Sequence, residues 1–177
     1  MVLSIDLSHD VGFTKTDIDF FTMTSASIDI ATQQDSAAIC TLLSALFEQE
    51  ADFSPNVDKQ QRAVEAIISH PDKGHILLLK RDDSVIGMLS LLYLPSTAMG
   101  GKVALLEDLI VAKPWRHQGY GSMLLEAAES FAKQQGCLRI TLLTDQDNRA
   151  AQKLYQKQGY QFSAMTVMRK QLSLIHI

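Results

Sequence analysis

The chain has 177 residues, of which 46% are hydrophobic and 20% are charged, and its formal net charge is −4. This composition is typical of a globular domain with a sizeable core. The negative balance argues against a nucleic-acid binder, whose surface is basic. No apolar run reaches the roughly 18 residues of a membrane span. We therefore expect neither a nucleic-acid partner nor a membrane partner.

The expected elements follow from hydrophobic periodicity and turn residues. Residues 1–26 carry no sustained period and are interpreted as an N-terminal arm, followed by a single domain over 27–177. The domain is expected to begin with a strand near 28–30, a helix that starts at Thr32 to Asp35 and runs through 39–47, and a second helix at 57–69. Three strands follow, at 75–80, 84–94 and 103–112. The expected C-terminal part is a helix closed by Gly136, a strand at 138–144, a helix before Gly159, and a last strand at 163–170.

This order indicates an α/β domain with a mixed sheet rather than repeated βαβ units. The two cysteines, Cys40 and Cys137, lie far apart in apolar patterns and are interpreted as buried free thiols of a reducing compartment. The five histidines show no ligand-like spacing, so we expect no metal. The N-terminus lacks the basic start and long apolar run of a signal peptide, and we expect a cytoplasmic protein.

The stretch "RHQGYG" at 116–121 places two glycines where a helix must start. A strand that ends before a helix N-terminus presents unpaired N–H groups and the positive end of the helix dipole. Gly119 and Gly121 remove side chains that would block close approach, so the turn is suited to an anion such as a phosphate. Neither nucleotide motif is present. The nearest Walker A candidate, at Gly101 and Lys102, has Ser96 at its first glycine and Val103 at its Ser/Thr position, and a Rossmann fingerprint from Gly119 has Leu124 at its last glycine.

Three segments together resemble the GNAT superfamily of N-acetyltransferases. "RHQGYG" matches the acetyl-CoA signature R/Q-x-x-G-x-G/A, and it follows a strand that reads "LEDLIV". "NRAAQKLYQKQGY" is similar to the family segment N-x-x-A-x-x-x-Y-x-x-x-G-F/Y. The resemblance covers about residues 27–171, and the order of elements agrees with it.

The resemblance implies a GNAT-type fold, with a mixed sheet of about six to seven strands splayed at a cofactor slot and about four flanking helices. It implies an enzyme that uses acetyl-CoA as co-substrate. The acetyl group would pass directly to a primary amine of a small molecule or peptide within a ternary complex. The family also favours a homodimer.

The resemblance assigns the cofactor contacts to three segments. The strand backbone at Leu109, Ile110 and Val111 would pair with the pantetheine arm, and a bulge there would part the two central strands. The pyrophosphate would lie on the loop and helix start formed by Arg116, His117, Gln118, Gly119, Tyr120, Gly121 and Ser122. Farther along, Asn148 and Ala151 would line the pantetheine, and Tyr155 would lie near its sulfur.

Acetyl transfer needs a proton acceptor for the amine, donors for the developing oxyanion and a proton for the departing thiolate. Tyr155, one helical turn after Ala151, is the expected acid, although an ordinary core tyrosine would show the same spacing. The backbone N–H of Ile110 or Val111 is the expected oxyanion donor. Because "LLEDLIV" is similar to the strand of diamine-type acetyltransferases, Glu107 is the expected base.

Two alternatives stay open for that carboxylate: a solvated strand-edge group, or a reaction without a dedicated base. Glu107 and Asp108 are adjacent on a strand, and we expect them to point to opposite faces. A second candidate function is a non-catalytic acyl-CoA-binding domain used for sensing or assembly. The presence of Glu107, Asn148 and Tyr155 favours the enzyme, because a sensor needs no acid at the sulfur.

Overall fold

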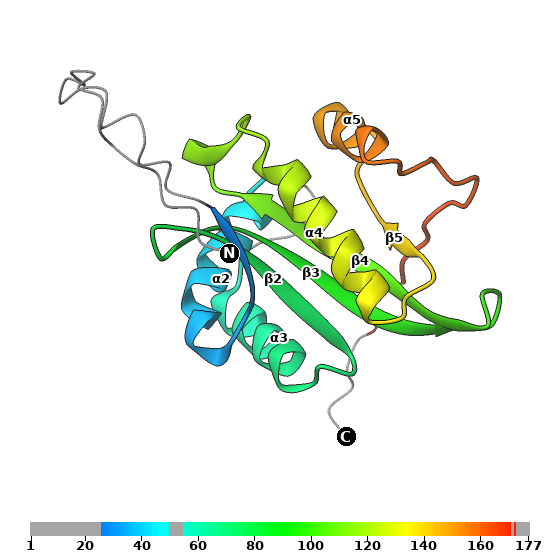
Figure 1. Cartoon of the computed structure of the whole chain (residues 1–177), viewed down its shortest axis with the longest axis horizontal. Coiled ribbons are helices and arrows are strands. Elements are labelled where there is room, and N and C mark those ends of the chain that lie inside the picture. The colour runs from blue at the N-terminus through cyan, green and yellow to red at the C-terminus, as the bar shows by residue number, and fades with distance from the viewer. Residues whose placement is uncertain (1–25, 50–54, 171, 173–177) are drawn as a thin grey trace, which may run out of the picture.

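A five-stranded mixed sheet in the order β1-β2-β3-β4-β5 forms the centre of the computed structural model, which describes residues 26–49, 55–170 and 172 (Figure 1). Strands β1 to β4 are antiparallel, and β5 pairs parallel to β4. The strands are β1 Ser27–Ile30, β2 Gly74–Arg81, β3 Ser84–Ser96, β4 Gly101–Val111 and β5 Ile140–Leu142. The helices are α2 Ser36–Phe47, α3 Val57–Ser69, α4 Tyr120–Gln134 and α5 Arg149–Lys157, with 3-10 turns η1 Gln33–Asp35 and η2 Lys113–Trp115.

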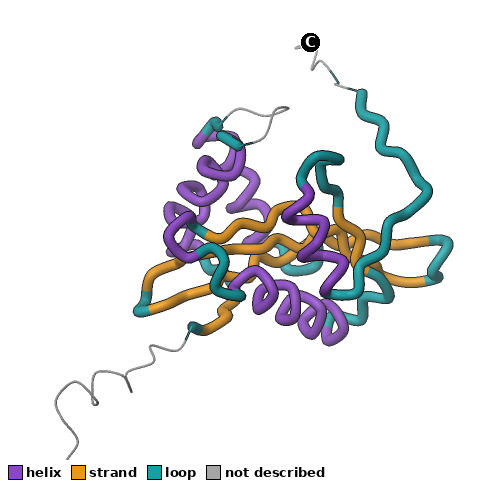
Figure 2. The backbone as a smooth tube through the Cα atoms, turned by 90° about the horizontal axis from the view of Figure 1, so that it is seen from above, coloured by secondary structure: helices purple, strands orange, loops and turns teal. Residues whose placement is uncertain are grey.

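The helices cover both faces of the sheet and define two cores (Figures 1 and 2). Because side chains alternate along a strand, Leu77 and Leu79 pack with α4 whereas Ile76 and Leu78 pack with α2 and α3. The apolar residues of the period-2 strand pattern and of the helical stripes in the sequence therefore lie in these two cores. We call the two sides the α4 face and the α2/α3 face.

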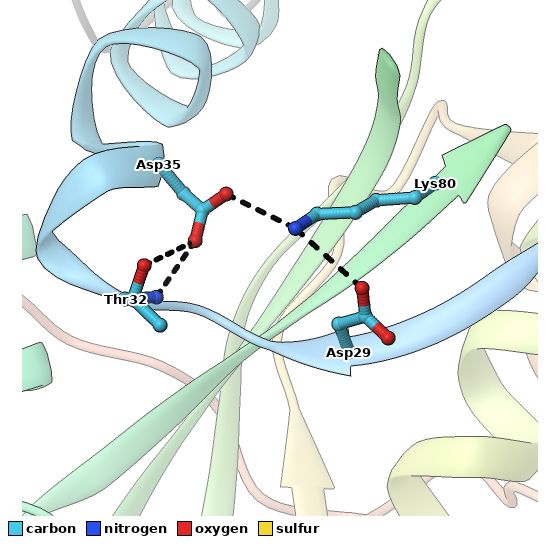
Figure 3. Close-up of polar contacts among 4 residues, drawn as sticks. All are labelled: Asp29, Thr32, Asp35 and Lys80. Carbon is cyan, nitrogen blue, oxygen red and sulfur yellow. Dashed lines mark hydrogen bonds and ion pairs between the residues drawn. The ribbon is translucent and has the colours of Figure 1, made fainter. Parts of the chain in front are cut away.

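A polar cluster ties β1 and the start of α2 to β2 (Figure 3). The Asp35 carboxylate accepts hydrogen bonds from the N–H and the hydroxyl of Thr32, both at 2.8 Å. The ammonium of Lys80 lies 3.2 Å from Asp35 and 3.5 Å from Asp29. Burial by itself raises the pKa of Asp35, but the hydrogen bonds from Thr32 and Lys80 outweigh it and leave this pKa below its usual value. The helix start predicted at Thr32 to Asp35 is confirmed.

The C-terminal part of the fold differs from the sequence prediction. Six to seven strands were expected, and the described residues form five. The prediction of a strand at 163–170 is wrong: these residues lie outside the sheet, and Met165 and Met168 are 88% and 93% exposed. Both of its alternating faces mix apolar with polar residues, so neither offers a continuous row for a core. Residues 1–25 of the predicted arm lie outside the described residues.

The expected number of helices is confirmed, and the expected burial of the two cysteines is confirmed for Cys40 only. Four α-helices are present in the described chain, and Cys40 and Cys137 are free thiols, the first buried and the second partly buried. Within the same ranges, no helix combines the length and the apolar character needed to cross a bilayer.

Leu78→Ala is expected to lower the free energy of unfolding by about 3 kcal/mol, because it removes a fully buried side chain and leaves a cavity. Leu94→Ala is the matched control, since Leu94 is 51% exposed. We expect the control to change the unfolding free energy by about 0.5 kcal/mol or less. Chemical denaturation measures both, and equal losses would contradict the assignment of the core.

Candidate functional site: a slot where two strands part

The two parallel strands β4 and β5 stay paired over a short distance only. Their register runs from Ala104↔Ile140 to Leu106↔Leu142. Strand β4 continues to Val111, so no described strand pairs with that edge of residues 107–111. An unpaired strand edge presents N–H and C=O groups that an extended ligand can bind as an added strand. In Figure 1, β5 diverges here from β4 and leads to α5.

A β-bulge lies at the point where the strands part. Leu109 pairs with Leu89 and Leu106 pairs with Leu91, so Glu107 and Asp108 together face the single residue Ser90. Side chains of two bulged residues point to the same side of a sheet. The expectation that Glu107 and Asp108 point to opposite faces is therefore wrong.

The packing of the neighbouring residues identifies the shared face. Leu106 and Leu109, on either side of the bulge, both pack in the core of the α4 face. Ile110 packs in the core of the α2/α3 face. Both carboxylates therefore lie on the α2/α3 face, where Asp108 contacts Ser90.

The helix start after β4 is open to an anion. Gly119 is the N-cap of α4 in the left-handed conformation (φ 87°), and no side chain caps the helix there. A Cβ added to Gly119 would meet nothing within 4 Å. The first-turn N–H groups of Tyr120, Gly121 and Ser122 have no partner within the helix and no side-chain cap, and they lie at the positive end of the helix dipole beside this open space. His117, also at positive φ (63°), shapes the turn before them.

The longer side chains of this loop brace it. Arg116 donates from Nε to the Val111 carbonyl at 2.8 Å and from Nη1 to Gln49 at 3.0 Å. Gln118 donates to the Pro114 carbonyl at 3.1 Å. These bonds hold the loop against the end of β4 and engage the Val111 carbonyl, which was expected to be available to a ligand. The loop offers an anion mainly its backbone N–H groups.

Gly121 has a packing reason of its own. A Cβ at this position would lie 3.0 Å from Cδ2 of Leu154, so the glycine lets α4 approach α5 closely. Asn148 caps α5, because its side-chain oxygen accepts a hydrogen bond from the Ala151 N–H at 3.1 Å. The side-chain oxygen of Asn148 is thus engaged, and its NH₂ group is the part left for a ligand.

Tyr155 lies on α5 and packs against the core of the α4 face. Its ring contacts Tyr160 edge-on, with ring centroids 5.9 Å apart. Burial raises the pKa of Tyr155, so its phenol stays protonated at neutral pH and can donate a proton. The phenol and the two carboxylates thus flank the sheet from opposite faces.

Three site residues were not selected from the sequence: Ser90, Asp108 and Gln152. Gln152 is buried and donates to the carbonyls of Asp145 and Gln146, at 2.8 and 3.1 Å, which fixes the loop between β5 and α5. The sequence feature that could have identified Ser90 is its polar side chain within an otherwise apolar run of strand residues. Within the described residues, no three His, Cys, Asp or Glu side chains come together as a metal site would require.

Comparison with known proteins defines the family. The model of the acetyltransferase (GNAT) family matches residues 37–160. The chain belongs to this family, and the resemblance of its motifs is confirmed.

Two curated relatives cover most of the chain. An uncharacterized N-acetyltransferase, YhfO, of Bacillus subtilis is 33% identical over 74% of this chain and 87% of its own length. An aminoalkylphosphonate N-acetyltransferase of Salmonella typhimurium is 30% identical over 75% of this chain and 83% of its own length.

Solved structures share the fold. A possible acetyltransferase from Clostridium difficile 630 has a TM-score of 0.76 at 16% identity, over 84% of this chain and 98% of its own. The aminoglycoside N-acetyltransferase AAC(6')-Iy in complex with CoA has a TM-score of 0.72 at 18% identity, over 83% of this chain and 95% of its own. The mixed α/β fold of GNAT acetyltransferases is thereby established for this chain.

Proposed function

We propose that this protein is an acetyl-CoA-dependent N-acetyltransferase that acetylates a primary amine of a small molecule or peptide. The observation that carries the proposal is the unpaired edge of β4 at 107–111, which ends beside the uncapped start of α4. These two features suit the two halves of coenzyme A: an extended amide arm and a diphosphate.

The residues fit that ligand. The open space at Gly119 leaves room for a diphosphate against the N–H groups of Tyr120, Gly121 and Ser122. The backbone of β4 at Leu109 and Ile110 would pair with the amide arm. On the far side of the slot, the arm would lie against α5, the helix that Asn148 caps and that carries Ala151 and Tyr155.

Acetyl-CoA supplies a thioester as the acetyl donor. In our proposal, the N–H of Val111 donates to the carbonyl oxygen of the reacting group, because the Ala112 N–H bonds the Ile86 carbonyl on β3 and strand alternation directs the Ile110 N–H to that strand as well. Tyr155, protonated and on the α4 face, gives its proton to the departing sulfur. A carboxylate at the bulge takes the proton of the amine, which arrives from the α2/α3 face and attacks directly. Glu107, exposed where the strands part, was the sequence prediction for this base and stays a prediction.

An amine acceptor agrees with what the relatives are named for. One curated relative is named as an aminoalkylphosphonate N-acetyltransferase, and one structural neighbour as an aminoglycoside N-acetyltransferase. Both compound classes carry primary amines. The predictions of a homodimer and of a cytoplasmic location stay predictions.

The test is an assay of purified protein with acetyl-CoA and a panel of primary amines: aminoalkylphosphonates, aminoglycosides, polyamines, amino acids and peptides. We expect release of free CoA with at least one amine, together with the N-acetylated product in the mass spectrum. If acetyl-CoA binds but no amine is acetylated, the non-catalytic acyl-CoA-binding function is supported instead. If acetyl-CoA does not bind, both functions fail.

A further inference from the structure

The bulge on β4 gives Glu107 and Asp108 different surroundings although they share one face. Glu107 is exposed, whereas Asp108 is partly buried. The Ser90 hydroxyl donates to Oδ2 of Asp108 at 2.8 Å, and the Asp108 N–H donates to the same hydroxyl oxygen at 3.1 Å. Ser90 itself is 1% exposed, so this two-way contact is a fixed part of the sheet. The side chain of Asp108 is therefore held in one position, while no residue in the described ranges makes a hydrogen bond of this kind with Glu107.

The location of Asp108 suits proton transfer. It follows the last β4–β5 pair, Leu106↔Leu142, by two residues and therefore lies where the two strands part. The hydrogen bond from Ser90 engages Oδ2, and no described side chain donates to Oδ1. The next residue pair on this face of β3 and β4, Met88 and Ile110, is apolar and belongs to the buried core of the α2/α3 face. A carboxylate in such surroundings is less well hydrated than one in water, and it binds a proton more readily.

The electrostatics point the same way. Burial raises the pKa of Asp108, and the neighbouring charge of Glu107 raises it further, while the Ser90 hydrogen bond lowers it in part. Glu107 is the ionisable group within the described residues that acts on this carboxyl. Ser90 on β3 is uncharged, α2 contributes the Cys40 thiol to the core of this face, and the buried polar side chains of α2 and α3, Ser36 and Gln60, carry no charge. A base acts best when its pKa lies near the working pH.

We propose that Asp108, held by Ser90, is the carboxylate that takes the proton from the acceptor amine, in place of the predicted Glu107. This proposal rests on the proposed N-acetyltransferase function. An N–H bond of the ammonium breaks, an O–H bond forms on Asp108, and the electron pair stays on nitrogen, from which it attacks the acetyl carbonyl. The proton then passes to solvent. Ser90 is a positioning residue, and Glu107 contributes negative charge at the exposed side of the slot.

Asp108→Asn separates this role from a structural one. The amide oxygen can still accept the hydrogen bond from Ser90, so the bulge keeps its contact while the side chain can no longer take a proton. Because folding raises the pKa of Asp108, the ionised carboxylate lowers stability above that pKa, and the neutral amide relieves this loss. We therefore expect the variant to unfold at no lower temperature than wild type at about pH 8.

The kinetic test uses acetyl-CoA and an amine that wild type acetylates, from about pH 6 to about pH 9. We expect Asp108→Asn to lower kcat/KM at least about tenfold at pH 7 and to remove only the part of the acid-side fall in rate that follows the titration of Asp108. The remaining rate should rise with pH as the free amine forms in solution. Glu107→Gln should show a smaller loss that is carried by KM. The exposed Glu129→Gln is the matched control and should behave as wild type.

An Asp108→Asn variant with wild-type kcat and an unchanged pH profile would overturn the proposal, as would a larger loss of kcat in Glu107→Gln. A second measurement does not depend on turnover. Carboxyl ¹³C NMR, with Asp108 assigned by its loss in Asp108→Asn, should show a titration midpoint above the ordinary aspartate range. An ordinary midpoint would contradict the proposal even in an active enzyme. Failure of wild type to acetylate any amine would instead remove the proposed function.

Discussion

Tyr155→Phe is expected to lower kcat about 100-fold, the usual contribution of a positioned general acid. The phenol is removed while the ring stays in its place against Tyr160. Because the raised pKa of Tyr155 keeps the wild-type group protonated, the variant loses a proton donor and no charge. The affinity for acetyl-CoA, measured by calorimetry, should change little. Steady-state kinetics with a saturating amine gives kcat.

Tyr160→Phe is the matched control for this change. The Tyr160 hydroxyl is buried and has no hydrogen-bond partner among the described residues, and burial, together with Glu129 and Tyr155, raises its pKa to about 12. Its removal should leave kcat unchanged and should not lower stability. Equal kcat values for Tyr155→Phe and wild type would exclude Tyr155 from proton transfer.

Gly119→Asp is expected to weaken acetyl-CoA binding at least about 100-fold, because a carboxylate would stand where the diphosphate must lie. Aspartate tolerates the left-handed conformation better than most residues and is a good N-cap, so it can satisfy the same N–H groups from within the chain. We expect the unfolding free energy to stay within about 1 kcal/mol of wild type. Calorimetry with acetyl-CoA and chemical denaturation measure the two effects.

Gly136→Asp is the control, since Gly136 follows the opposite end of α4 with a similar positive φ of 74° and equally open surroundings. It introduces the same charge and comparable backbone strain away from the proposed site. It should bind acetyl-CoA as wild type does. A similar affinity for both variants would show that the start of α4 does not hold the diphosphate. Gly121→Val is a poorer test, because the new side chain would press on Leu154.

Local patterns in the sequence predicted most of the fold. The helix start at Thr32, the strands at 75–80 and 84–94, and the long helix that ends near Gly136 were each confirmed; the two strands meet in a tight turn at Asp82 and Asp83. In each case the determinants lie within a few residues of one another, as a cap, a turn or a periodic stripe. The motif around Gly119 also predicted an uncapped helix start, because only backbone conformation and the absence of a side chain are involved.

The family resemblance predicted a bulge near Leu109 to Val111, but the residues alone could not place it at Glu107 and Asp108. It depends on how β4 pairs with β3, and nothing in "LLEDLIV" reveals that two of its residues face the single residue Ser90. The faces of Glu107 and Asp108 followed from that register, and so did the difference in their burial. The strand expected at 163–170 failed for a related reason: strand propensity does not say whether a neighbouring edge will pair with the segment.

The central claim is that coenzyme A occupies the slot between β4 and α5, with its diphosphate on the first turn of α4. A crystal structure of the protein with CoA tests it most directly. We predict phosphate oxygens within hydrogen-bond distance of the N–H groups of Tyr120, Gly121 and Ser122, and the amide arm paired with β4 at 107–111. Electron density for CoA at another place, or a slot filled by protein side chains in its presence, would contradict the account.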